Sequence, residues 1–242
     1  MTERATFIGL ALGGALIVHV ASARADEGAD AVPAFPPVAP VAIPSPPDEH
    51  EQFVHHFAIG YLGLSSLPIA ATGTPGAPAQ VGSVNAPVIG ARYWFSSRLG
   101  LDAGFGLGLL TGSEQPTSFG FALHAGLPIA LRHAPHYTVE LIPEVAGGFT
   151  TGSIAIPSQS DATVGGQLIR AGARAGVEIH FGFIGIPQLA LQASLGLYYS
   201  YQRITYRQGS FATSGTSSLL TTSVEGAPRA IFTNSVSALY YF

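Results

Sequence analysis

Apolar residues alternate with small or polar residues along most of this chain, with a period of two. The clearest stretch runs from Leu99 to Leu109, where Leu, Phe and Ala alternate with Gly and one Asp. Successive side chains of a strand point to opposite faces, so each such segment has one apolar face. The pattern predicts eight strands, at Phe53–Gly63, Val84–Phe95, Leu99–Leu109, Phe119–Leu131, Tyr137–Phe149, Gln167–Phe181, Gln188–Tyr201 and Arg229–Phe242.

The connections between these segments alternate between short and long. Short turns are predicted at Ser96–Arg98, Arg132–His136 and Gly182–Pro187. Longer loops, rich in Ser, Thr, Gly, Ala and Pro, are predicted at Leu64–Ser83, Leu110–Ser118, Thr150–Gly166 and Gln202–Pro228. Aromatic residues gather near both ends of the strands, as in interfacial girdles. Together these features predict an all-β fold, an eight-stranded antiparallel up-and-down transmembrane β-barrel with periplasmic turns and outward-facing loops.

The composition is typical of a chain that meets lipid with its strands. Only 10% of the residues are charged, and the mean hydropathy is +0.36. No run in the body of the chain reaches the roughly 18 apolar residues that a spanning helix needs. A secreted soluble barrel with an internal ligand is the architectural alternative, but it would carry its charges outward. Here nearly all strand charges share a face with the glycines.

Three segments are predicted along the chain. Residues 1–25 read as a signal peptide, with Ala23 and Ala25 marking its cleavage site, and a retained anchor helix is the alternative. Residues 26–52 are a Pro- and Ala-rich disordered linker, or a tether to peptidoglycan or to a partner. Residues 53–242 form the barrel. The chain contains no Cys, so no disulfide and no lipid-modified Cys contributes to it.

The chain ends on Phe242, with Tyr240, Ala238 and Val236 at the alternate positions before it. This ending resembles the C-terminal signal that small bacterial outer-membrane barrels of the OmpA, OmpX and OmpW type present to the barrel-assembly machinery. The resemblance covers residues 53–242. It implies an outer-membrane location and a chain that contacts outer-membrane lipid and lipopolysaccharide.

The face shared with the glycines also carries ionisable residues, which are predicted to meet inside the barrel. They are Arg92, Asp102, His124, Glu140, Glu144, Arg170, Arg174 and Glu178. A turn centred on Ser97 places Arg92 beside Asp102. A turn centred on Ala134 places His124 beside Glu144.

An outer hairpin centred on Pro157 adds two further pairs to this interior network. It places Glu144 opposite Arg170 and Glu140 opposite Arg174. Buried charges persist only when they are paired, so the network is interpreted as a plug that fixes strand register and fills the narrow bore. A proton or ion path through the same residues is the alternative.

No pattern of catalytic or metal-binding residues appears. Barrels that deacylate lipopolysaccharide need a catalytic base at the outer rim. The predicted outer loops contain no His that could serve as this base, so the resemblance does not extend to these enzymes. His55 and His56 point to opposite faces of a strand and cannot share one metal ion there. No cofactor, metal or nucleic-acid partner is expected.

Two functions follow from these predictions. The first is a non-enzymatic outer-membrane barrel that stabilises the envelope, or that serves surface recognition or adhesion through its loops, with its lumen plugged. The alternative is a narrow or lateral-path transporter for small hydrophobic solutes, since apolar residues such as Leu64, Leu67 and Ile69 fall in a predicted outer loop.

Overall fold

The computed structural model describes residues 48–72, 80–111, 117–156, 159–223 and 236–242. The predicted signal peptide, with Ala23 and Ala25, and most of the predicted linker lie outside the described residues. Within the described ranges, no helix has the length and apolar character needed to cross a bilayer.

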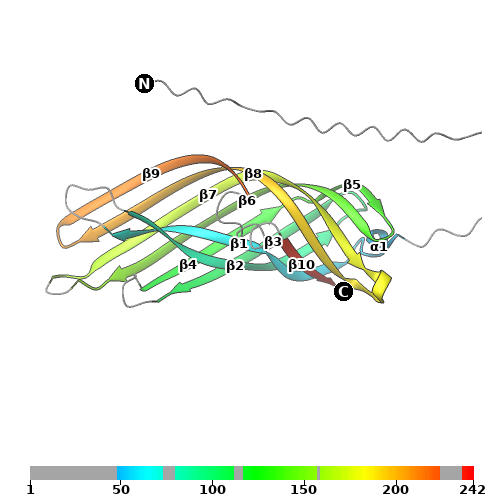
Figure 1. Ribbon diagram of the computed structural model, residues 1–242, viewed down its shortest axis with the longest axis horizontal. Coiled ribbons are helices and arrows are strands. Elements are labelled where there is room, and N and C mark those ends of the chain that lie inside the picture. Colours follow the sequence, from blue (N-terminus) through cyan, green and yellow to red (C-terminus); the bar gives the residue numbers. More distant parts are fainter. Residues whose placement is uncertain (1–47, 73–79, 112–116, 157–158, 224–235) are drawn as a thin grey trace, which may run out of the picture. The chain divides into compact units, whose positions relative to one another are not determined.

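The described residues form antiparallel strands and two short helices, which confirms the prediction of an antiparallel all-β chain (Figure 1). The helices are α1 (Glu49–Gln52) and the 3-10 helix η1 (Gly182–Ile184). The strands are β1 (Phe57–Thr72), β2 (Gln80–Trp94), β3 (Gly100–Leu110), β4 (Thr117–Gly126), β5 (Ile129–Ala134), β6 (Tyr137–Ile154), β7 (Ala162–Phe181), β8 (Ile186–Gln208), β9 (Phe211–Thr222) and β10 (Val236–Tyr241).

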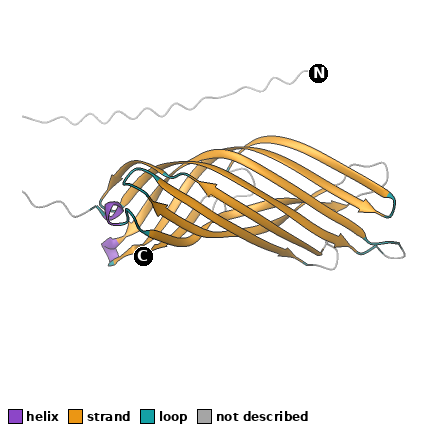
Figure 2. Ribbon diagram, turned by 180° about the vertical axis from the view of Figure 1, so that it is seen from behind, coloured by secondary structure: helices purple, strands orange, loops and turns teal. Residues whose placement is uncertain are grey.

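The strands follow one another in a single sheet that closes on itself. The hydrogen-bonded order runs from β1 through β2, β3, β4, β6, β7 and β8, and β10 then pairs with both β8 and β1. This closed path is called the ring. Helices α1 and η1 and the C-terminus lie together at one end of it, called the α1 end, and β9 reaches the opposite, far end (Figures 1 and 2).

The eighth position of the ring is shared by two strands. β10 pairs with the first part of β8, where Leu239 faces Ala190, and β9 pairs with the second part, where Thr216 faces Arg203. Similarly, β4 pairs with one part of β6 and β5 with another. Ten strands therefore occupy eight places around the ring.

β1 changes course beyond Tyr61. Its pairing with β10 covers Ala58–Tyr61, and its register with β2 then shifts at Gly63, which has a positive φ of 129°. Four successive residues, 67–70, are buried, which breaks the period of two. The carbonyl oxygen of Pro68 accepts a hydrogen bond of 2.6 Å from Thr150 Oγ1 on β6. The second half of β1 therefore bends toward the lumen of the ring.

Glycines on β6 and β7 allow the second half of β1 to pack closely against these strands. A Cβ atom at Gly166 on β7 would lie 1.8 Å from the Pro68 oxygen, and one at Gly148 on β6 would lie 2.6 Å from Leu67 Cδ2. At the far end, Ile69 and Ala70 then join an apolar cluster with residues of β2, β7 and β8. β9 pairs with β8 along one edge, and along its other edge it has no strand partner among the described residues.

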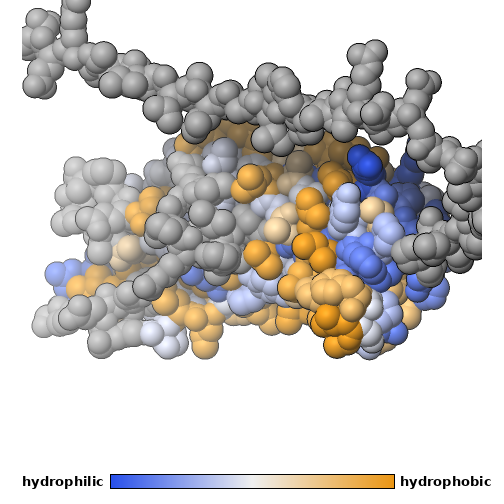
Figure 3. Space-filling view, turned by 45° about the vertical axis from the view of Figure 1, so that its right-hand side comes forward, coloured by the Kyte–Doolittle hydropathy of each residue, from blue (hydrophilic) through white to orange (hydrophobic). Residues whose placement is uncertain are grey.

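The two faces of the sheet have the predicted sidedness. Phe105 is 53% exposed and Leu101 and Leu191 are 39% exposed, whereas Arg92 and Glu140 are fully buried. Large apolar side chains thus cover the outside of the ring, and Figure 3 shows many of them in orange on the face that it draws. The charged side chains named above lie inside.

Several predicted boundaries are wrong. The loops predicted at Leu64–Ser83 and Gln202–Pro228 contain the second half of β1, the start of β2, the end of β8 and all of β9. The strand predicted to start at Phe53 starts at Phe57, and that predicted at Arg229 is described only from Val236. The exposed residues of β9 and of the end of β8 are mostly Ser, Thr and Arg, so the apolar alternation that marked the other strands is weak there. The linker, predicted to end at Gln52, ends in helix α1 instead.

Candidate functional site

Arg92 on β2 lies at the centre of the buried charges. Its Nε and Nη2 atoms donate to the two carboxylate oxygens of Asp102 at 2.7 and 2.8 Å, a two-pronged contact across the β2–β3 pair. Its Nη1 atom lies 3.2 Å from Glu140 Oε2 on β6 and also pairs with Glu178 on β7. One guanidinium group therefore holds three carboxylates, and all four side chains are fully buried.

Three further side chains complete this group and were not predicted. The amide of Gln192 donates to Glu140, and its oxygen lies 3.4 Å from Arg92 Nη2. The hydroxyl of Tyr241 donates to Glu178 at 2.8 Å, and Trp94 Nε1 donates to that hydroxyl at 3.1 Å. The period of two in the sequence could have indicated Gln192 and Tyr241. Leu191 and Tyr240 were expected to point outward, so the residues that follow them point inward.

A second charged group lies next to the first. Arg174 Nε is 2.8 Å from Glu144 Oε2, and Arg174 Nη2 is 3.6 Å from Asp102 Oδ2, although neither contact has hydrogen-bond geometry. Arg174 Nη1 donates to Ser237 Oγ at 3.4 Å. His124 Nε2 lies 3.8 Å from the same Glu144 oxygen. Asp102 thus links the two arginines.

Arg170 differs from the prediction. It was expected opposite Glu144, but it faces Ala146, and Arg174 faces Ile142 rather than Glu140. The hairpin between β6 and β7 is centred one residue beyond Pro157, which shifts every partner by two positions. Arg170 is half-buried, and its guanidinium carbon lies 4.6 Å from the centre of the Tyr198 ring.

The predicted pairing of His124 with Glu144 across neighbouring strands is also wrong in register. His124 faces Ala146 on β6, and Glu144 faces Gly126. The connection from β4 to β6 passes through β5 and is longer than the turn assumed from the sequence. The two side chains still approach each other inside the ring, because residues two positions apart share one face.

Helix α1 closes the ring at the α1 end. Asp48 caps the helix by accepting from His50 N at 3.0 Å and pairs with His133. Glu49 Oε1 lies 2.8 Å from His136 Nδ1, and its Oε2 accepts from the backbone N–H of Gly182 at 3.3 Å. These contacts tie α1 to two turns of the ring.

His50 is the deepest residue of α1. Its side chain is fully buried, and its Nε2 atom lies 2.9 Å from the Ser97 carbonyl oxygen. The imidazole therefore donates a hydrogen bond to the turn that contains Ser97. The His50 imidazole also packs edge-to-face against the Trp94 indole, with 4.5 Å between the centres of the two aromatic rings. Burial lowers the pKa of His50 below its ordinary value of 6.5, which favours the neutral imidazole.

A hollow of about 290 Å³ lies beside the charged groups. Its lining includes Arg170, Arg174 and Tyr198, and it extends between residues 62–66 of β1 and the end of β9, where Leu219, Thr221, Thr222 and the following Ser223 line it. No hydrogen bonds between β1 and β9 occur among the described residues. The hollow therefore sits where the wall of the ring is least closed.

The C-terminal residues follow the predicted alternation. Tyr240 and Phe242 are exposed on the outside, and Val236 and Ala238 are partly exposed on the same face. Buried Tyr241 points inward to Glu178. In the described part of the chain, no group of three or more His, Asp or Glu is arranged to hold a metal ion.

Comparisons with known proteins give little support. No protein-family model matches the chain, and no curated protein matches it. The chain is similar to a solved outer-membrane channel of the COG4313 group from Pseudomonas putida F1, with 13% identity over 85% of this chain and 100% of that chain, at a TM-score of 0.24. At this TM-score the two backbones overlap only slightly.

Proposed function

We propose that this chain is a non-enzymatic β-barrel protein of the bacterial outer membrane, with a plugged lumen, that stabilises the envelope or serves surface recognition or adhesion. The observation that carries the proposal is the convergence of six strands on one buried group. Its members are Arg92 (β2), Asp102 (β3), Glu140 (β6), Glu178 (β7), Gln192 (β8) and Tyr241 (β10). These side chains come from six of the eight positions and are buried, which supports a filled bore at this level.

The outer face of β8 supports a bilayer-spanning position. From Leu189 its outward residues are Leu or Ala up to Leu197, then Tyr199 and Tyr201. At a rise of about 3.3 Å per residue, Leu189 to Tyr201 covers about 40 Å of strand. With a tilt of about 40°, this is about 30 Å along the membrane normal, close to the thickness of a hydrocarbon core.

The neighbouring strands change character at the same level. Phe149 on β6 faces Gln167 on β7, which faces Arg203 on β8, two residues beyond Tyr201. On the apolar side of this row the outer face carries residues such as Val145 and Ile169, and on the other side it carries Thr and Ser. On these three strands the outer face therefore changes from apolar to polar at one row, which supports a membrane surface near this level.

Electrical recording tests the plug. The full chain is refolded into phosphatidylcholine vesicles, and a band shift between unheated and heated samples on gels reports that it has folded and inserted. Fused to a planar bilayer, the folded protein is expected to remain electrically silent, because the charged group fills the bore. A reproducible, salt-dependent conductance would contradict the plugged lumen, and failure to insert would contradict the membrane proposal itself.

A lateral route for small hydrophobic solutes is the second candidate, and the hollow between β1 and β9 favours it. In this version a solute enters the lumen from the side, above the charged group. Ser200→Phe adds a bulky side chain to this hollow, because Ser200 is buried among its lining residues. Uptake of a small apolar dye into vesicles is expected to fall in this variant and to stay normal in Thr216→Phe, on the exposed face of β9. Equal uptake in both variants would exclude the hollow as a route.

Outer-membrane lipid, lipopolysaccharide and the barrel-assembly machinery are the partners that this proposal requires. The exposed Tyr240 and Phe242 support the last of these, because an assembly factor would meet them on the outer surface. The absence of enzymatic activity remains part of the proposal.

A further inference from the structure

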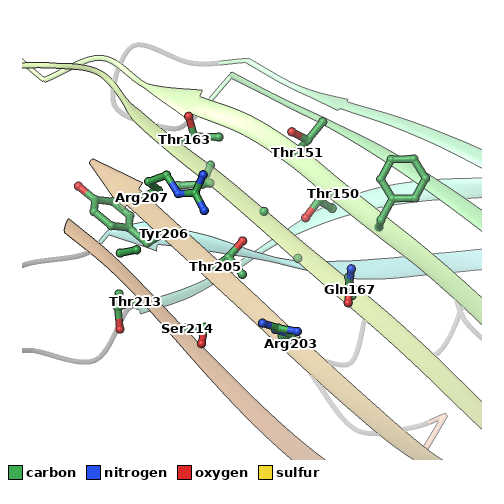
Figure 4. A pocket seen from close by; sticks show the side chains of 15 residues that line it. Thr150, Thr151, Thr163, Gln167, Arg203, Thr205, Tyr206, Arg207, Thr213 and Ser214 are labelled. Carbon is green, nitrogen blue, oxygen red and sulfur yellow. The ribbon is translucent and has the colours of Figure 1, made fainter. Parts of the chain in front are cut away.

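Two arginines stand on the outside of the ring at its far end. Arg203 and Arg207 on β8 are both exposed and, with Thr205 between them, lie on the same outward face (Figure 4). The other described arginines lie elsewhere. Arg92, Arg170 and Arg174 face the lumen, and Arg98 and Arg132 lie at the α1 end.

Hydroxyl and amide groups surround the two arginines. Gln167 and Thr163 on β7 face Arg203 and Arg207, and Ser214 on β9 faces Thr205. Together with Thr151 on β6 they line a hollow of about 740 Å³ (Figure 4). The hollow therefore offers two cations and several uncharged hydrogen-bonding groups, a donor set suited to phosphate.

Neither Arg203 nor Arg207 has a carboxylate partner in the part of the chain that the structure describes. Among the residues placed by the structure, Asp161, just before β7, is the acidic residue nearest in register, because Ala162 faces Gln208. In contrast, Arg92 and Arg174 each contact at least two carboxylates.

The distance of the two arginines from the edge of the apolar band indicates which class of ligand could contact both. Arg203 and Arg207 lie two and six residues beyond Tyr201. At the rise and tilt used above, they stand about 5 Å and about 15 Å outside the hydrocarbon core. The headgroup layer of a phospholipid is only about 5–8 Å thick, so it reaches Arg203 alone. A ligand that reaches both has acyl chains, a phosphate near the core and further anionic groups above it.

We propose that this face binds a phosphorylated glycolipid of the outer leaflet, the lipopolysaccharide class. Its acyl chains lie against outward residues such as Leu197, a phosphate of the lipid contacts Arg203, and an anionic group of the saccharide contacts Arg207. This inference rests on the proposed position of the chain in the outer membrane.

The test compares glycolipid binding by the full chain and by matched charge variants. The protein is refolded in zwitterionic detergent micelles, its band shift on gels is verified, and it is titrated with lipopolysaccharide that retains its phosphates. The Arg203→Gln/Arg207→Gln double variant is expected to bind at least about tenfold more weakly, because it loses two charge-assisted contacts. The control is Arg98→Gln/Arg132→Gln, which removes the same charge from the exposed α1 end.

Each outcome has a distinct meaning. A loss confined to the far-end variant supports the site, whereas an equal loss in both variants, or none, overturns it. Competition by inorganic phosphate as strong as that by intact glycolipid also overturns it, because a simple anion site would then be enough. If the far-end variant shows no band shift, Arg203→Gln alone replaces it. Wild-type chain that inserts into vesicles but does not bind the glycolipid contradicts only this inference and leaves the membrane proposal standing.

Discussion

The two ends of the ring are filled by different means. At the α1 end, a charged group with hydrogen bonds to Gln192, Tyr241 and Trp94 occupies the lumen, and α1 covers it. At the far end, the lumen holds an apolar cluster built partly by β1 itself, through Ile69 and Ala70. The hollow lined by Arg170 lies next to the charged group, where no hydrogen bonds join β1 and β9 within the described ranges.

This difference follows from how completely the sheet closes. Near the α1 end every position of the ring is hydrogen-bonded to both neighbours, so residues from six strands can be held close enough to pair their charges. Unpaired charges are costly to bury, and the charges that are fully buried here, those of Arg92 and its three carboxylate partners, lie where that closure is complete. Beside the edges of β1 and β9 that are unpaired within the described residues, a hollow with polar lining remains, and Arg170 is half-buried there against an aromatic ring. Beyond it, at the far end, apolar side chains fill the lumen.

Removing Arg92 is expected to have the largest effect. Arg92→Ala leaves three buried carboxylates without their central counter-charge, which costs about 3–5 kcal/mol of stability. The measurement is the temperature at which the folded band disappears on gels run after stepwise heating. Arg98→Ala, an exposed arginine at the α1 end, is the control and should leave this temperature unchanged. Equal behaviour of the two variants would show that the charged group does not stabilise the α1 end.

Gly166→Ala tests the inward course of β1. The added methyl group would lie 1.8 Å from the Pro68 oxygen, so β1 must move outward or the variant must lose about 1–3 kcal/mol. Hydrogen exchange of the amides in residues 62–72 is expected to accelerate. Gly147→Ala is the control, since its nearest neighbour would be 3.6 Å away. Unchanged exchange at these amides would rule out tight packing of β1 against β7.

Acidification is expected to loosen α1 without opening the ring. Because burial lowers the pKa of His50, its contribution to docking is complete above the ordinary pKa of 6.5 and is lost as the pH falls below it. Hydrogen exchange in residues 49–52 should therefore be faster at about pH 5 than at about pH 7.5.

His50→Gln is the reference for this experiment. Gln keeps a donor that can reach the Ser97 oxygen but does not titrate, and the variant retains the contacts of His133 with Asp48 and of His136 with Glu49. The difference between the two proteins thus isolates His50. An acid response of the same size in both would assign the effect to other groups.

Removing Arg170 is expected to have the smallest effect of the four. Arg170 has no carboxylate partner within the described residues, and its contact with Tyr198 contributes about 0.5–2 kcal/mol. Arg170→Ala should therefore shift the unfolding temperature less than Arg92→Ala does. A shift as large as that of Arg92→Ala would mean that charge burial stabilises the level of the hollow as strongly as it does the α1 end.

The sequence predicts sidedness and short-range register well. Alternation alone places Phe105 outside and Glu140 inside, and the short turn around Ser97 correctly places Arg92 opposite Asp102. Both depend only on the period of a strand and on a turn too short to vary. Long connections are different, since a shift of one residue in the centre of the β6–β7 hairpin moved the partners of Arg170 and Arg174.

The features that the sequence did not reveal depend on tertiary contacts. β9 is rich in Ser and Thr, and most of its residues are exposed, so it has no apolar face to mark it. β1 breaks its alternation at residues 67–70 because it enters the lumen, which no local pattern requires. Helix α1 has only four residues, and its position is set by the turns that it contacts.

Helix α1 contacts three hairpins that are far apart in the sequence. His50 meets the turn at Ser97, Glu49 N donates to Pro135 O beside His136, and the Glu49 carboxylate reaches the turn at Gly182. The three contacts can be made together only when the corresponding turns lie side by side. The docked helix therefore cross-links three hairpins, and separating any one of them from the others requires breaking its contacts with α1.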